Sequence, residues 1–289
     1  MIRRKEEQKF DIPVQQGHTL LKIVVSNNSK YLALSDTNKH IIIWDVVLKK
    51  VVSTIAVEVG ELWSLAISND SKFLAAPFNN TTVKIWDITN GREVKKHELH
   101  TCKPYFVCFT DRLLLSADGE GNVVAWGCER GTEEFKLYQK VLHCDTVRGH
   151  VSYDYRYLAL GHDLKLVVWN LAERSVEFTL DLSYGTITAV HYSKEGKNLV
   201  LSTTDKKLVI IDLEEKNVNE ILVRHSDTIN DVVQTKDGKM IISAGSDKLI
   251  KVFQSGEFQD YKVSNKYGKS VITSVMDPIN SNFVVGYKN

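Results

Sequence analysis

The chain lacks several features that mark other protein classes. It has four cysteines in 289 residues and no closely spaced pair, which favours free thiols in a reducing compartment over a disulfide scaffold. Lysine and arginine (37) nearly balance aspartate and glutamate (36), so the basic surplus typical of nucleic-acid-binding proteins is missing. No apolar run approaches the ~20 residues that a membrane span needs.

The N-terminal stretch MIRRKEEQKF also lacks the apolar segment of a signal peptide. With no span and no such signal, the sequence predicts a soluble intracellular protein, cytoplasmic or nuclear, without a membrane partner.

No enzyme motif is present: GxSxG, HExxH and GxxxxGK[ST] do not occur. The closely spaced glycines of SADGEGNVV lead into a strand, whereas a phosphate-binding loop would open a helix. His97, His100 and Cys102 share one short segment with no evident fourth ligand, which argues against a zinc site. We therefore predict a protein that is not an enzyme and that holds no metal or cofactor.

A short apolar strand ending in a Trp-Asp pair, or in a related pair, recurs along the chain. Successive copies lie 42, 40, 43, 42 and 42 residues apart, which is the length of one four-stranded propeller blade. Each unit holds short β-rich runs separated by Asn, Asp, Ser and Gly clusters, the pattern of an all-β array. The residues at the Trp position are Trp44, Trp86, Trp126, Trp169, Ile211 and Phe253.

The turn before this strand repeats as well. A polar residue stands six positions upstream of the Trp position, where its side chain can accept hydrogen bonds from the turn's own backbone. These residues are Asn38, Asn80, Glu120, Asp163, Asp205 and Asp247. His18, His100 and His225 fall near the start of three units, and Gly17 makes the first of them a Gly-His pair.

These features resemble the WD-repeat β-propeller family, whose repeat has Gly-His near one end and Trp-Asp near the other. The resemblance covers nearly the whole chain and implies a single all-β domain over residues 1–289, a seven-bladed propeller of four-stranded antiparallel blades. It also implies that the Trp packs between neighbouring blades. Its indole N–H would join a polar network with His, Ser or Thr, and Asp.

Ring closure leaves three alternatives open. A seventh unit begins with SVITSVMDP and NFVVGYKN, and the period places the N-terminus inside or just after its missing strand. Lys9–Val14 then reads as the outer strand of a last blade closed by both chain ends. The intervening MIRRKE is a poor β sequence. Either it is used anyway, or the chain is a fragment, or the blade is incomplete.

Partners of WD-repeat proteins often bind the face at the start of each inner strand. Projecting the repeat onto that face places aromatic side chains among charges of both signs in units two and three, and such aromatics often anchor interfaces. For Trp63 the alternative is that it fills the gap between two blades. The predicted partner-binding residues are Trp63, Tyr105, Lys103, Glu61, Phe78 and Asp145.

The function that follows is a non-catalytic scaffold that presents one propeller face to a protein or peptide partner within a larger assembly. The alternative is an RNA-associated subunit of an RNA-modifying or ribosome-assembly complex. The basic tracts MIRRK, VLKK and EVKKHE could supply a local patch for RNA.

Overall fold

The computed structural model describes most of the chain, and every regular element in the described part is a β-strand. Within that part no helix exists that could span a membrane. The described residues are 19–57, 62–78, 81–98, 100–128, 133–138, 144, 146–223, 225–235, 239–254, 260–264, 271–276 and 283–287.

The strands form six four-stranded antiparallel sheets, here blades 1 to 6, each joined in simple chain order. Blades 1 to 3 contain β1 (Leu20–Val25), β2 (Tyr31–Asp36), β3 (His40–Asp45), β4 (Lys50–Ala56), β5 (Ala66–Ile67), β6 (Phe73–Pro77), β7 (Thr82–Asp87), β8 (Glu93–Glu98), β9 (Pro104–Phe109), β10 (Leu113–Asp118), β11 (Asn122–Gly127) and β12 (Glu133–Tyr138). Blades 4 to 6 contain β13 (Val147–Val151), β14 (Tyr157–His162), β15 (Lys165–Asn170), β16 (Ser175–Asp181), β17 (Ile187–Tyr192), β18 (Asn198–Thr203), β19 (Lys207–Asp212), β20 (Asn217–Val223), β21 (Ile229–Gln234), β22 (Met240–Gly245), β23 (Ile250–Gln254) and β24 (Asp260–Ser264).

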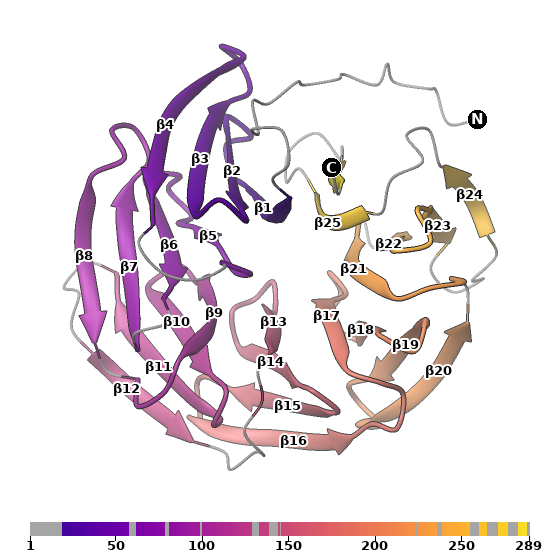
Figure 1. The fold of residues 1–289 in the computed structure, drawn as a ribbon. Coiled ribbons are helices and arrows are strands. Elements are labelled where there is room, and N and C mark those ends of the chain that lie inside the picture. The colour runs from indigo at the N-terminus through magenta and orange to yellow at the C-terminus, as the bar shows by residue number, and fades with distance from the viewer. Residues whose placement is uncertain are drawn as a thin grey trace.

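The blades are arranged around one axis as a β-propeller, with the first strand of each blade innermost and the fourth outermost (Figure 1). The all-β propeller expected from the repeat is therefore confirmed. Seven four-stranded blades are not confirmed, because the described part of the chain forms six.

A two-stranded sheet follows the sixth blade, formed by β25 (Val271–Met276) and β26 (Phe283–Tyr287). β25 lies between β1 and β21, the inner strands of blades 1 and 6, and contacts both (Figure 1). The strand expected at Lys9–Val14 lies outside the described residues, so its pairing stays a prediction.

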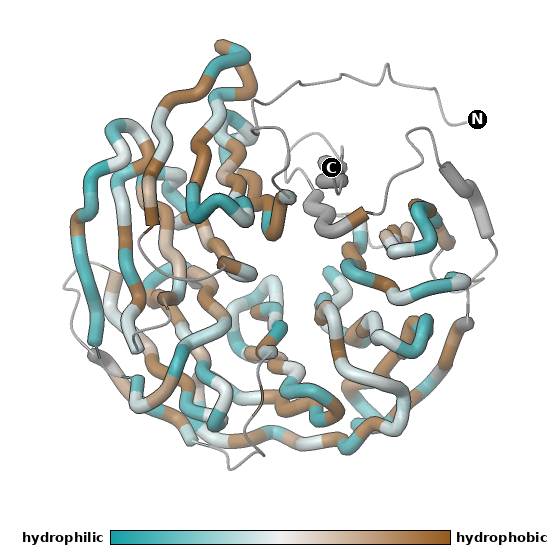
Figure 2. Tube along the Cα trace, in the orientation of Figure 1, coloured by the Kyte–Doolittle hydropathy of each residue, from teal (hydrophilic) through white to brown (hydrophobic). Residues whose placement is uncertain are grey.

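The hydrophobic core lies between the blades. The middle strands are covered on both faces by neighbouring sheets and therefore read as continuous apolar runs, such as His40–Asp45. Ile43 of blade 1 and Trp86 of blade 2 belong to one buried cluster. The outer strand β8 is mostly charged and exposed, and Figure 2 shows hydrophilic residues along it.

Five of the described innermost strands have a β-bulge near their starts. The pairing register with the second strand shifts between Leu20 and Lys22, and equivalent shifts occur in β9, β17, β21 and β25. A bulge leaves one residue outside the ladder. The bulge residues are Leu21, Tyr105, Thr188, Asn230 and Ile272.

Trp86 tests the inter-blade core. Its side chain is 3% exposed and its ring lies 5.7 Å from that of Phe78, centroid to centroid. Trp86→Ala should lower the free energy of unfolding by about 3–5 kcal/mol, because it leaves a large cavity between two blades. Chemical denaturation measures this effect.

Tyr138→Ala, at a side chain that is 61% exposed, is the control and should change stability by less than about 1 kcal/mol. Equal effects of the two substitutions would contradict the assignment of Trp86 to the core.

Candidate binding site at the centre of the ring

A buried polar network fixes the geometry of blade 3. The His100 ring lies between Asp118 Oδ2 (2.9 Å from Nδ1) and Ser116 Oγ (2.7 Å from Nε2). Trp126 Nε1 donates to the same Ser116 oxygen at 3.2 Å. A buried indole needs an acceptor, and this network supplies one. The network implied by the family resemblance is therefore present in blade 3.

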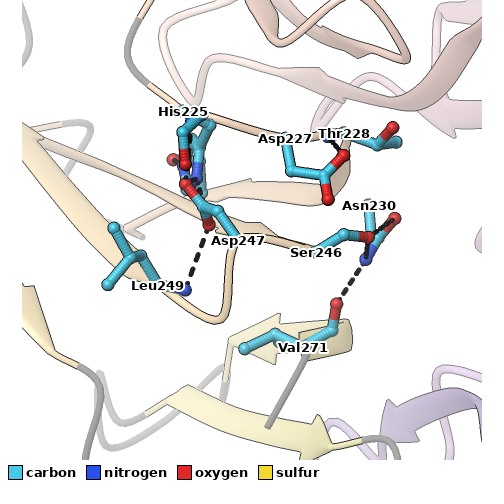
Figure 3. A network of polar contacts seen from close by, with 10 residues as sticks. His225, Asp227, Thr228, Asn230, Ser246, Asp247, Leu249 and Val271 are labelled. Atoms are coloured by element: carbon cyan, nitrogen blue, oxygen red, sulfur yellow. Dashed lines mark hydrogen bonds and ion pairs between the residues drawn. The ribbon is translucent and has the colours of Figure 1, made fainter. Parts of the chain in front are cut away.

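Blade 6 has Phe253 at the Trp position and builds a variant of this network. In this variant Asp247 lies against His225 (Figure 3). His225 contacts Asp247 (2.9 Å) and Ser243 (2.7 Å). Asp247 stands two residues later than Asp118 does in its own blade, and Gly245 occupies the place of Asp118. A β-carbon at Gly245 would lie 2.7 Å from His225 Nδ1 and 2.8 Å from Asp247 Oδ1. Because Gly245 has no side chain, the Asp247 carboxylate has space to reach the His225 ring.

Blades 1 and 4 keep the Trp but not the network. Trp44 and Trp169 are buried, yet within the described residues their indole nitrogens have no hydrogen-bond partner. The position that Ser116 fills in blade 3 is Leu34 in blade 1 and Leu160 in blade 4. Trp169 packs in a buried cluster that includes residues of blade 3, and Trp44 packs in a cluster with residues of its own blade. Neither makes the polar link that the resemblance implied.

The turn acceptors also differ from expectation. In blade 1 Asp36 Oδ1 accepts from the backbone N–H groups of Asn38 and His40, at 3.0 and 2.9 Å. In blade 3 Asp118 plays this part for the backbone of Glu120. In these two blades the acceptor therefore stands two residues before the predicted position, while Asp247 of blade 6 accepts from its own turn as expected.

Trp63 lies just before β5 and has an exposed side chain, with 38% of its surface accessible. The guanidinium carbon of Arg148, on β13, lies 5.8 Å from the centre of the Trp63 ring. Blade 3 separates the blades that hold these two residues, so the contact is made across the centre of the ring. We call Trp63, Lys103, Tyr105 and Arg148 the rim site.

Tyr105 and Lys103 belong to the start of blade 3. Both are partly buried, and Lys103 Nζ lies 4.6 Å from the centre of the Tyr105 ring. The Tyr105 ring also packs against the turn at Gly119, where a β-carbon would lie 3.1 Å from Tyr105 Cε2. The structure thus holds both predicted side chains in one cation–π pair.

The other predicted residues divide in two groups. Phe78 is 2% exposed and packs against Trp86, so it belongs to the core and is closed to a partner in this conformation. Glu61 and Asp145 lie outside the described residues.

In blades 5 and 6 the residues equivalent to Tyr105 are Thr188 and Asn230, and each hydrogen-bonds to the next inner strand. Thr188 Oγ1 donates to the carbonyl of Ile229 in the next inner strand, at 2.5 Å. Asn230 Nδ2 donates to the carbonyl of Val271 on β25, also at 2.5 Å (Figure 3). These small polar side chains are therefore structural.

Two other histidines are buried. His162, at the end of β14, is 4% exposed, and its Nδ1 lies 3.7 Å from the Cys144 sulfur. Burial lowers the pKa of His162 to about 4. His97 stacks on Trp126 with ring centroids 4.0 Å apart. Among the residues that the structure describes, no group of His, Cys, Asp or Glu side chains could hold a metal ion.

Sequence reasoning missed Arg148. The available signal was the 42-residue period, which places Arg148 in the slot that Lys22 occupies in blade 1 and Ser64 in blade 2. That slot lies one residue beyond the projected rim position, Val147.

The family model described as WD domain, G-beta repeat matches residues 50–87 and 216–254. These segments run from the outer strand of one blade through the third strand of the next. No curated protein matches the chain. The chain therefore contains two segments similar to the WD-domain, G-beta repeat and forms a β-propeller, which is consistent with a WD-repeat family.

Asp118 tests the blade 3 network through the pH dependence of stability. Burial raises its pKa, but hydrogen bonds from His100 and Asn122 outweigh burial, and the pKa lies below its ordinary value of 3.8. The stability that the carboxylate contributes is therefore complete above pH 3.8 and is lost as the pH falls through the lower folded-state pKa.

Asp118→Asn should lower the free energy of unfolding by about 1.5–3 kcal/mol at pH 7, because it removes charge-assisted hydrogen bonds. The deficit should shrink below pH 3.8, as denaturant titrations at several pH values would show. The exposed Asp205 supplies the control, Asp205→Asn. A deficit for Asp118→Asn that is constant with pH would contradict a stabilising carboxylate.

Proposed function

We propose that the protein is a non-catalytic interaction scaffold that holds a peptide segment of a protein partner at the rim site. WD-repeat propellers commonly serve as protein-interaction scaffolds, which supports the general role. The observation that supports the location is Trp63, a large aromatic side chain that stays 38% exposed next to a guanidinium group at the centre of the ring.

The chemistry of the rim site suits recognition. Trp, Tyr and Arg are the residues most enriched among interface hot spots, and all three occur here. Trp63 offers apolar surface, while Lys103 and Arg148 place positive charge against aromatic faces. Because the equivalent polar side chains of blades 5 and 6 already join neighbouring blades, recognition concentrates on blades 2 to 4.

A rigid platform also requires a closed ring. We infer that β25 and β26 are the inner part of a seventh sector of one domain. The support is that β25 contacts the inner strands on both sides, and that Asn230 donates to the carbonyl of Val271. The ring then has no exposed inner edge between blades 6 and 1.

Trp63→Ala should weaken the partner's binding at least about thirtyfold, the ~2 kcal/mol that defines an interface anchor. Partners are first captured with tagged wild-type protein and identified by mass spectrometry, and their affinity is then measured with purified proteins. The mutant should keep a melting temperature close to that of the wild type, because Trp63 belongs to none of the buried clusters between the blades.

Leu164→Ala is the matched control, since Leu164 is an exposed apolar residue (48%) of blade 4 outside the rim site. It should leave the affinity unchanged. If Trp63→Ala folds normally and binds every captured partner as tightly as the wild type, the proposed site is wrong.

A further inference from the structure

Three charged residues lie on the described innermost strands: Lys22, Arg148 and Asp231. They occupy equivalent positions, because each pairs with the small residue that stands one before the end of the second strand. These pairs are Lys22 with Ser35, Arg148 with Gly161, and Asp231 with Ala244. The sequence period therefore brings all three to one level of the ring.

Two of these charges compensate each other. Lys22 Nζ lies 3.5 Å from Asp231 Oδ2, a bridge that reaches from blade 1 to blade 6. Arg148 has no such partner among the described residues: its one hydrogen bond runs from Nη1 to the Val147 carbonyl at 3.3 Å. A guanidinium has five N–H donors, so most of the donors of Arg148 are unused.

Among the residues that the structure describes, Asp231 is the one carboxylate whose field acts on Arg148. His150 and His191 lie two residues further along their strands, with ring centroids 4.1 Å apart. Burial lowers the pKa of His191 to about 4 and that of His150 well below its ordinary value, so both rings are neutral at pH 7. Lys22 and Arg148 are positive and Asp231 is negative, so these three residues leave a net charge of one positive at this level of the ring.

A cation withdrawn from water without a counter-ion is costly. Burial lowers the pKa of Arg148, and the field of Asp231 offsets this only in part. The group that suits a planar guanidinium is a carboxylate, which it binds through two parallel hydrogen bonds. A carboxylate carries one negative charge and so matches the one unbalanced charge at this level of the ring, that of Arg148.

We propose that Arg148 binds the carboxylate of an aspartate or glutamate side chain from a peptide that rests on Trp63. The contact between Arg148 and the Trp63 ring makes the two sites continuous. This inference rests on the proposed function and adds the chemistry of the partner: an acidic residue next to the residue that contacts Trp63.

The first experiment needs no partner. Arg148→Met keeps an apolar side chain of similar length beside Trp63 but removes the charge. The melting temperature of this variant should equal or exceed that of the wild type, because a ligand-binding cation stabilises nothing when the site is empty. Lys206→Met, at an exposed lysine, is the control. A clear fall in melting temperature for Arg148→Met alone would assign Arg148 a structural role and overturn the proposal.

The second experiment selects binders from a display library of random twelve-residue peptides on the full-length protein. The enriched peptides should contain an aspartate or glutamate. For the best peptide, changing the acid to its amide or introducing Arg148→Met should each weaken binding about tenfold to a hundredfold. The two changes together should weaken it no further, since they remove the same contact. Lys206→Met should leave the affinity unchanged.

The outcomes separate this inference from the proposed function. Peptides that need Trp63 but neither an acid nor Arg148 would overturn the inference and leave the rim site standing. Peptides whose binding needs an acidic residue and Arg148 but not Trp63 would support the carboxylate site. They would contradict the proposal that Trp63 anchors the partner. Enrichment of phosphorylated over acidic versions of the same peptide, or the failure of any peptide to bind, would contradict a carboxylate site.

Discussion

The structure depends on one packing constraint: each sheet buries both faces against its neighbours, so the first and last sheets must also meet. No blade is stable alone, because its middle strands are apolar on both faces. β25 provides the meeting point, since it contacts β1 on one side and β21 on the other. The hydrogen bond from Asn230 to the Val271 carbonyl repeats, at this junction, the link that Thr188 makes to Ile229 between blades 5 and 6.

The same constraint determines which polar groups remain for recognition. His100 and His225 hydrogen-bond within buried networks of their own blades. Thr188 and Asn230 hydrogen-bond to the inner strand of the next sheet. Trp63 and Arg148 differ, because their contact joins blades that are not neighbours and fixes no sheet to the next. This is why we assign the proposed partner contact to Trp63 and Arg148.

The sequence period predicted the strands, the turns and the inter-blade tryptophans, because a 42-residue repeat places equivalent residues in equivalent surroundings. It could not predict the polar networks, which depend on single residues: Ser116 completes one, whereas Leu34 leaves the Trp44 indole without its acceptor. Phe78 was projected to the rim but is buried against Trp86, because its backbone stays bonded to the next strand, with its N–H donating to the Thr82 carbonyl. Periodicity also overlooked Arg148, since a period gives position and not the partners that a charge finds across the ring.

Hydrogen exchange at β25 tests the closed ring most directly. Amides of an inner strand that is paired and packed between two neighbours exchange only through opening of the surrounding structure. In the full-length protein under native conditions, the amides of Val271–Met276 that pair with β26 should be protected to a degree similar to the paired amides of Ile229–Gln234 in β21. Exchange of the β25 amides at the rate of an unstructured peptide, with β21 still protected, would show that the ring is open and would contradict the account.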